Sequence, residues 1–102
     1  MNNEMNTLIE NIKADYAGFR ERSEIRDRMI AEFNENITYN VGSKYIKVVT
    51  SNRVWGFIVN TDNDKKFKKG DILKPAGWAA AARNFARGNI LEGGYTVRWT
   101  GA

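Results

Sequence analysis

Cysteine and histidine are both missing from this chain of 102 residues, and proline occurs only once. Without cysteine there are no disulfides and no thiolate nucleophiles. Without histidine the chain lacks the usual general base near neutral pH and the commonest metal ligand. Zinc sites and Ser–His or Cys–His nucleophile pairs are therefore excluded, which leaves only carboxylate, lysine or tyrosine chemistry. We expect a protein that is not an enzyme, with no catalytic residues and no cofactor.

Long hydrophobic runs are missing as well. The apolar runs are far shorter than the ~20 residues that span a bilayer. The N-terminal stretch MNNEMNTLIENIK has no apolar core typical of a secretion signal. Together with the lack of cysteine, this predicts a cytoplasmic protein that does not enter a membrane. The length predicts a single domain, residues 1–102, with room for one core.

Two short patterns resemble known binding loops but lack their essential residues. Asp62 and Asp64 have the spacing that begins a calcium loop, yet the central glycine and the later bidentate glutamate are missing and lysines crowd the site. The glycine-containing stretch GNILEGG lacks the spacing and the lysine of a phosphate-binding loop. We therefore expect no metal site.

Charge divides the chain into two parts of opposite sign. Residues 1–36 carry five basic and eight acidic side chains, whereas residues 37–102 carry eleven basic and four acidic ones. The overall charge of +4 thus hides an acidic N-terminal segment joined to a basic body. Such an asymmetry bears on binding partners and not on the fold.

The acidic segment has the periodicity of an amphipathic helix. Apolar residues recur at helical spacing at Met5, Leu8, Ile9, Ile12, Tyr16 and Phe19, and again at Ile25, Met29, Ile30 and Phe33. Gly18 and the polar residues 20–24 interrupt this stripe, so we expect one long helix with a weak point or two helices. Thr7 and Glu10 have capping-box spacing. The helical face would cover a sheet or serve in a homodimer.

From Ile37 onward the apolar period changes to two, which is typical of strands. ITYNV, KYIKVV, RVWGFIV and YTVRW are the strand candidates. A hairpin turning at Ser51 and Asn52 would pair Val48 with Trp55 and Ile46 with Phe57 on one face, and Tyr45 with Ile58 on the other. Apolar groups on both faces predict a sheet covered on two sides.

The C-terminal third combines several elements. We expect a short strand at 72–74, an alanine-rich helix at 77–87 with Trp78, Ala81, Ala82 and Phe85 on one face, and a last strand at 95–99. The predicted fold class is therefore α+β, with an N-terminal helix or helix pair packed on a twisted antiparallel sheet of four to five strands. A small open β-barrel is the alternative.

Positive side chains of the basic body suggest a surface for anions. Residues 65–69 hold four lysines around Phe67, and Lys74, Trp78, Arg83 and Arg87 follow closely. Such residues attract phosphates, and an aromatic ring can stack on a base. The plainer alternatives are a solvated loop with Phe67 in the core, and a buried Trp78 with arginines on the wet side of a helix. The candidate nucleic-acid-binding residues are Lys44, Lys47, Arg53, Lys65, Lys66, Lys68, Lys69, Lys74, Trp78, Arg83 and Arg87.

The segment GDILKPAGWAAAARNFARGN, together with the KYIKV strand and the final WTGA, resembles small uncharacterised proteins of tailed bacteriophages. The resemblance covers about residues 40–102 and differs from the family in having Ala81 where members often have proline. It implies a phage-encoded protein in the cytoplasm of an infected bacterium, or a small virion component. It supplies no active site.

The sequence therefore predicts a binding protein that contacts nucleic acid through a basic face with little sequence preference. The alternative is a protein–protein module that binds or inhibits a host factor, or a minor component of a virion. A homodimer through the N-terminal helix is a possible assembly.

Overall fold

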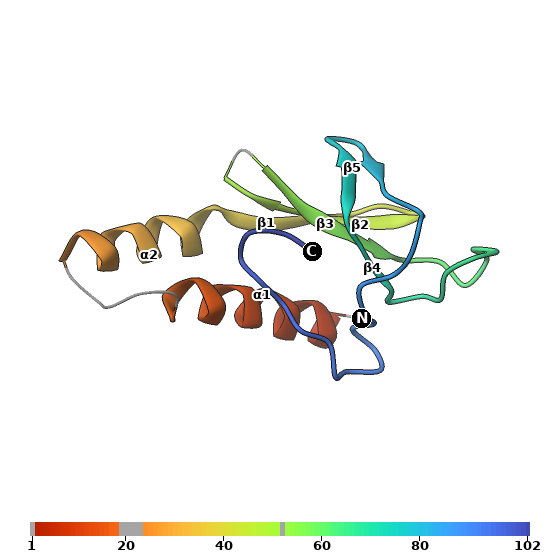
Figure 1. The fold of residues 1–102 in the computed structure, drawn as a ribbon, viewed down its shortest axis with the longest axis horizontal. Helices are drawn as coiled ribbons and strands as arrows, with labels where there is room; N and C mark the ends of the chain where they lie inside the picture. Colours follow the sequence, from red (N-terminus) through yellow and green to blue (C-terminus); the bar gives the residue numbers. More distant parts are fainter. Residues whose placement is uncertain (1, 19–23, 52) are drawn as a thin grey trace.

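The computed structural model describes residues 2–18, 24–51 and 53–102, apart from the side chains of residues 24 and 26. Two helices precede an antiparallel four-stranded sheet of order β1-β2-β3-β4, and a separate two-stranded sheet follows (Figure 1). The elements are α1 (Asn2–Ala17), α2 (Glu24–Asn36), β1 (Ile37–Val41), β2 (Tyr45–Thr50), β3 (Arg53–Val59), β4 (Ile72–Leu73), β5 (Pro75–Gly77) and β6 (Ala80–Ala81). The fold class is α+β as predicted, and the open sheet does not form the alternative barrel.

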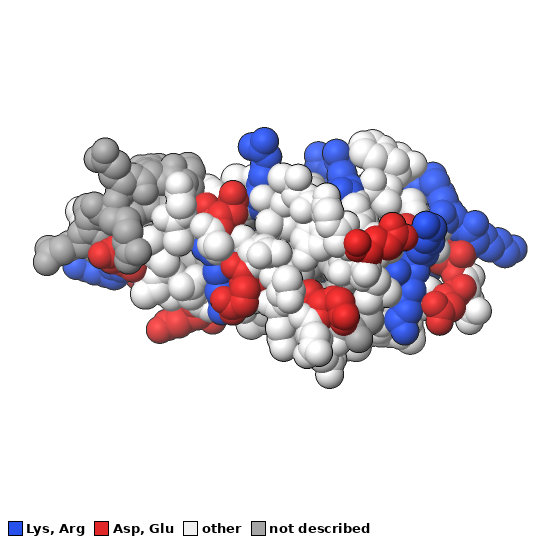
Figure 2. Space-filling model, turned by 90° about the horizontal axis from the view of Figure 1, so that it is seen from below, with Lys and Arg blue, Asp and Glu red and all other residues white. Residues whose placement is uncertain are grey.

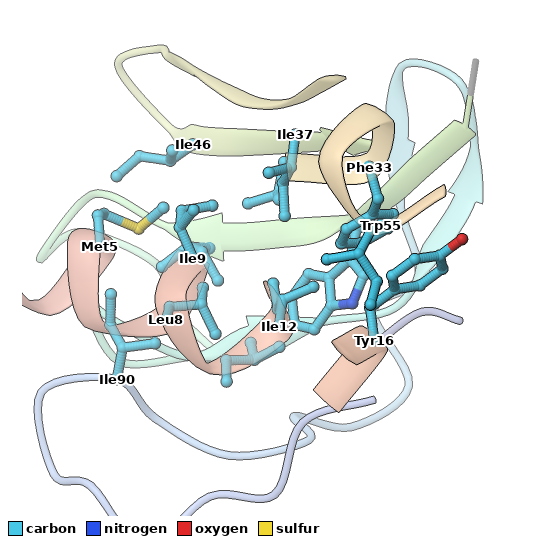
Figure 3. Packing of buried hydrophobic residues seen from close by; sticks show 14 residues of the cluster. Met5, Leu8, Ile9, Ile12, Tyr16, Phe33, Ile37, Ile46, Trp55 and Ile90 are labelled. Atoms are coloured by element: carbon cyan, nitrogen blue, oxygen red, sulfur yellow. The ribbon is translucent and has the colours of Figure 1, made fainter. Parts of the chain in front are cut away.

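The N-terminal segment forms two helices and not one long helix. The apolar stripe of α1 is buried, with Leu8 and Ile12 fully inaccessible to water. These side chains point from α1 toward the sheet, where they meet Ile37, Ile46 and Trp55 (Figure 3). Of the residues expected to interrupt the helix, 19–23 lie outside the described part. No helix in the described ranges is long and apolar enough to cross a membrane.

The predicted capping box is wrong. The helix already begins at Asn2, so Thr7 lies inside α1. There its hydroxyl donates a hydrogen bond of 3.0 Å to the carbonyl oxygen of Asn3, one turn earlier. Capping residues act only at a helix end, because only there are backbone N–H groups left without a partner.

The central hairpin has the predicted turn but a different register. Thr50 pairs with Arg53, which confirms a loop of residues 51–52, and Val49 pairs with Val54. A β-bulge next to Val48 then shifts the pairing, so that Val48 faces Gly56, Ile46 faces Ile58 and Tyr45 faces Val59. The bulge gives β3 one extra residue, and Trp55 can therefore reach the helix-covered core together with Val48.

The predicted alanine-rich helix at 77–87 does not form. β5 and β6 instead make a small hairpin, which is followed by irregular chain. The backbone N–H groups of Ala82 and Arg87 donate to the carbonyls of Lys74 and Ile72, at 2.7 Å each. These tertiary hydrogen bonds outweigh the helix preference of alanine, which amounts to only a few tenths of a kcal/mol per residue.

The last predicted strand, 95–99, is also not part of a sheet. Its side chains do alternate: Tyr95, Val97 and Trp99 pack against the core, while Thr96 and Arg98 are exposed. The segment runs across α1 (Figure 1), and the N–H of Trp99 donates to the carboxylate of Asp15 at 2.8 Å. A period of two thus identified the inward side chains correctly, but the hydrogen-bond partner is not a strand.

Candidate functional site

A cleft of about 500 Å³ opens at the end of the sheet where the β1–β2 turn and the loop after β3 meet. The turn is closed by a hydrogen bond of 2.9 Å from the N–H of Gly42 to the carbonyl of Tyr45. The side-chain amide of Asn60 donates to the carbonyl of Gly42 at 2.8 Å and ties the loop to the turn. The cleft is lined by Ser43, Lys44, Thr61, Asn63, Asp64, Lys65 and Arg83.

An ion pair between Asp64 and Arg83 organises this cleft. Oδ1 of Asp64 accepts from Nη2 of Arg83 and from the backbone N–H groups of Lys66 and Phe67, at 2.9 Å each. The Asp64 side chain is only 1% exposed, whereas that of Arg83 is 38% exposed. Arg83 and these two N–H groups hold the pKa of the Asp64 carboxyl well below its ordinary range. Asp64 is therefore charged at neutral pH and fixes the direction of Arg83.

Arg83 is held on its other sides as well. Its Nη1 donates to the hydroxyl of Tyr45, and its guanidinium lies 5.0 Å from the centre of the Phe67 ring. Hydrogen bonds to Asp64 and Tyr45 raise the pKa of Arg83 above its already high ordinary value. Phe67 is buried, so the alternative that placed this ring in the core is correct.

A further contact between a cation and an aromatic ring lies on the face of the sheet opposite the helices, which the cluster around Phe57 and Leu73 partly covers. Tyr45 and Lys47 are two residues apart on β2 and so lie on the same face. Nζ of Lys47 lies 3.9 Å from the ring centre of Trp78, at the tip of the β5–β6 hairpin. Trp78 is 59% exposed, so the alternative that buried it is wrong. A cation over an aromatic face at this distance is an attractive contact.

We name the resulting surface the basic strip. It consists of Lys44, Lys47, Lys65, Lys66, Arg83 and the ring of Trp78. Lys66 belongs to it because its Nζ donates to the carbonyl oxygen of Arg83. Asp64 and the exposed Asp62 are the carboxylates on the adjoining loop, so the strip keeps a positive balance.

The figures agree with this placement at the end of the molecule. The loop after β3 forms the right-hand end in Figure 1. In Figure 2, which keeps the same horizontal axis, Lys and Arg side chains lie at that end beside Asp and Glu side chains. Side chains of both signs also lie along the rest of the visible surface (Figure 2).

Five of the predicted binding residues lie apart from the strip or have no contact that links them to it. Lys68 forms an ion pair of 3.1 Å with Glu92, which raises the pKa of the lysine. Lys68 and Arg87 line another cleft, of about 520 Å³, that also contains Asp71 and Glu92. Arg53 lies at the opposite end of β3 and donates to the carbonyl of Thr100 at 3.5 Å. The remaining two are Lys69 and Lys74.

Sequence reasoning missed the residues that shape the strip. The sequence pattern presents Asp64 as a possible metal-ligating or catalytic carboxylate and Tyr45 as a strand residue, and neither as a partner of Arg83. A signal existed in the loop, because an Asp whose carboxylate binds N–H groups two and three residues later is a common turn device. The partner of that Asp, Arg83, could not be read from the sequence because it is distant along the chain.

The arrangement offers hydrogen-bond donors and positive charge. Within the described ranges there is no group of three or more Asp or Glu side chains that could hold a metal ion. Comparisons with protein-family models, curated proteins and solved structures find no match to this chain. The chemistry of the strip itself must therefore carry any functional conclusion.

Proposed function

We propose that this chain binds nucleic acid through the basic strip, with little preference for base sequence. The observation that supports the proposal is the lining of one cleft by Lys44, Lys65 and Arg83, together with the contact between Lys47 and the exposed ring of Trp78. Cations that track a backbone beside a stacking aromatic ring are the usual design for single-stranded nucleic acid.

The residue types also explain why sequence would matter little. Four of the five cations are lysines, which neutralise phosphates without the two-pronged geometry that reads a guanine edge. The only arginine, Arg83, already donates to Asp64 and Tyr45 and is held in one orientation. Trp78 can stack on any base, because every base presents an aromatic face.

A fluorescence titration with single-stranded and double-stranded oligonucleotides tests the proposal. Five phosphate contacts give a slope of log affinity against log salt of about −3.5 to −4.5. Affinity should therefore fall roughly 100- to 500-fold between 50 and 200 mM salt. No binding by the wild type, or binding that salt does not change, contradicts the proposal.

A matched pair of variants locates the surface. Lys44→Gln combined with Lys65→Gln removes two exposed charges of the strip and should weaken binding about tenfold or more, with a slope about 1.5 to 2 shallower. Arg28→Gln combined with Arg98→Gln removes the same charge from exposed sites elsewhere and should have a much smaller effect. Equal losses of affinity in the two double variants would show that binding depends on net charge alone, and would contradict the basic strip as the binding site.

A second candidate, a protein-binding module, is favoured by a separate observation. Ile25 and Met29 lie one turn apart on α2, with exposed fractions of 70% and 42%. A partner protein or a second copy could cover these side chains. A pull-down with nuclease-treated lysate, repeated with Ile25→Lys, tests this candidate: a partner lost with the variant supports it, and an unchanged set of partners contradicts it.

A further inference from the structure

The two edges of the four-stranded sheet differ in whether another segment of the chain covers them. At the β4 edge, the N–H of Ile72 donates to Gly88 and its carbonyl accepts from Arg87, at 2.8 and 2.7 Å. Asn89 forms a further bridge with Asp71. Residues 87–90 therefore cover this edge, and β1 remains as the other edge of the sheet.

The direction of each backbone group on β1 follows from the hydrogen bonds at its two ends. Gly42 donates to Tyr45, and Ser51 donates to Asn36. Both contacts belong to even-numbered residues that flank β1, Asn36 and Gly42, and bonding alternates along an antiparallel pair. The even residues thus face β2, and the N–H and C=O groups of Ile37, Tyr39 and Val41 point away from the sheet. Outside the helices and strands, no backbone group of the described residues bonds to Tyr39 or Val41, whereas the N–H of Ile37 directly follows the last turn of α2.

β1 also lacks the features by which proteins protect an open edge. Its sequence, ITYNV, contains no lysine, no proline and no other charged residue. Val41 is 66% exposed although it is apolar. A groove of about 350 Å³ runs beside the strand, between Ile37 and Tyr39 of β1 and Ile9 of α1.

We propose that β1 pairs with β1 of a second copy of this chain, antiparallel and centred on Tyr39. This pairing places Val41 of each copy opposite Ile37 of the other, on the helix-covered face, where the groove beside Ile37 receives it. The outward N–H and C=O groups of Tyr39 and Val41, and the carbonyl of Ile37, then find backbone partners. The two sheets become one sheet of eight strands.

Charges at the ends of the paired strands also favour a second copy of this chain as the partner of β1. Glu35 precedes β1 and Lys44 follows it, and both are exposed. In the antiparallel pair centred on Tyr39, the end that carries Glu35 in one copy meets the end that carries Lys44 in the other. Opposite charges thus face each other at both ends, whereas a parallel pair would place like charges together.

Hydrogen exchange by NMR, combined with light scattering over a range of concentrations, tests the pairing. The wild type should reach twice the mass of one chain. The N–H groups of Tyr39 and Val41 should become protected as the dimer forms, while those of Thr38 and Asn40 are protected already in the monomer. A wild type that stays monomeric at millimolar concentration, or a dimer without this protection, overturns the proposal.

Two variants on the same strand complete the test. Val41→Lys puts a charge at the paired edge and should shift the dimerisation constant at least tenfold toward monomer. Thr38→Lys makes the same change at an exposed position on the other face of β1 and should shift the dimerisation constant much less, since Thr38 lies opposite an exposed Asn40 of the other copy. A dimer that withstands Val41→Lys but is lost with Ile25→Lys would place the interface on α2 and overturn the assignment to β1.

Discussion

At the scale of single residues, Asp64 shows how burial and partners set the behaviour of a charge. Its carboxylate is shielded from water and accepts from Arg83 and two backbone N–H groups. Because its folded-state pKa lies below the unfolded value, its contribution to stability is complete above about pH 4 and is lost as the pH falls through the folded-state pKa.

Asp64→Asn should therefore lower the unfolding temperature at pH 7, since it leaves the guanidinium of Arg83 without its carboxylate partner. The difference from the wild type should narrow progressively below about pH 4. Thermal unfolding of both proteins from pH 7 to pH 2 checks this. Asp62→Asn is the control, because Asp62 is exposed on the same loop. A difference in unfolding temperature between Asp64→Asn and the wild type that stays constant from pH 7 to pH 2 would contradict this explanation.

Gly56 is a second residue whose environment permits a direct prediction. A Cβ at Gly56 would lie 2.9 Å from the carbonyl oxygen of Leu73 and 2.8 Å from Cβ of Ala102. Gly56→Ala should thus destabilise the fold by ~1–3 kcal/mol, as overpacking typically does. Gly77→Ala is the control, because nothing lies within 4 Å of its added Cβ. Urea unfolding of the two variants should show a loss for the first and almost none for the second.

At the scale of elements, local periodicity predicted the helices and the first three strands because their apolar faces are buried as a stripe or an alternation. The face of α1 from Met5 to Tyr16 is an example. The β-bulge beside Val48 could not be predicted, because it depends on where Trp55 fits in the core. The helix at 77–87 was wrong for a related reason: Ala81 and Ala86 pack against a second cluster around Phe57 and Leu73.

The candidate binding site, too, depends on tertiary contacts that local sequence patterns do not reveal. The sequence names both the cation Lys47 and the aromatic residue Trp78 as candidate binding residues. Their grouping depends on contacts between distant segments, such as Arg83 with Asp64, and on the hairpin that replaced the expected helix. A sequence shows which charges exist but not which of them, like Lys68 with Glu92, are already paired.

The β5–β6 hairpin leads to a prediction about Trp78. Since this side chain is 59% exposed, Trp78→Ala should change the free energy of unfolding by no more than ~0.5 kcal/mol. The free energy with which the Trp78→Ala variant binds a single-stranded oligonucleotide should nevertheless weaken by ~1–3 kcal/mol, the usual contribution of one stacked base. Phe85→Ala is the matched control, because Phe85 is 51% exposed but lies outside the strip. Equal affinities for the two variants would remove Trp78 from the binding surface.

At the scale of the whole molecule, one core joins segments from both ends of the chain. Tyr16 of α1 stacks on Phe33 of α2 at 4.1 Å and meets the edge of Trp99 at 4.9 Å. The indole N–H of Trp55, on β3, donates to the carbonyl of Arg98 at 2.7 Å. Helices, sheet and C-terminal segment are therefore expected to unfold together.

Denaturant unfolding followed by two probes checks this expectation. Far-ultraviolet circular dichroism reports the helices, and tryptophan fluorescence reports the contacts of Trp55 and Trp99. The two curves should coincide, as they do in a cooperative two-state transition. Separate midpoints would show that the acidic helical segment and the basic body unfold independently.

The contact between Asp15 and Trp99 spans 84 positions of the sequence, and this has a consequence for synthesis on the ribosome. At common elongation rates, roughly 4 to 17 seconds separate the appearance of these two residues. During that interval α1 lacks its contact with the segment around Trp99. This part of the core can therefore form only after translation has reached Trp99.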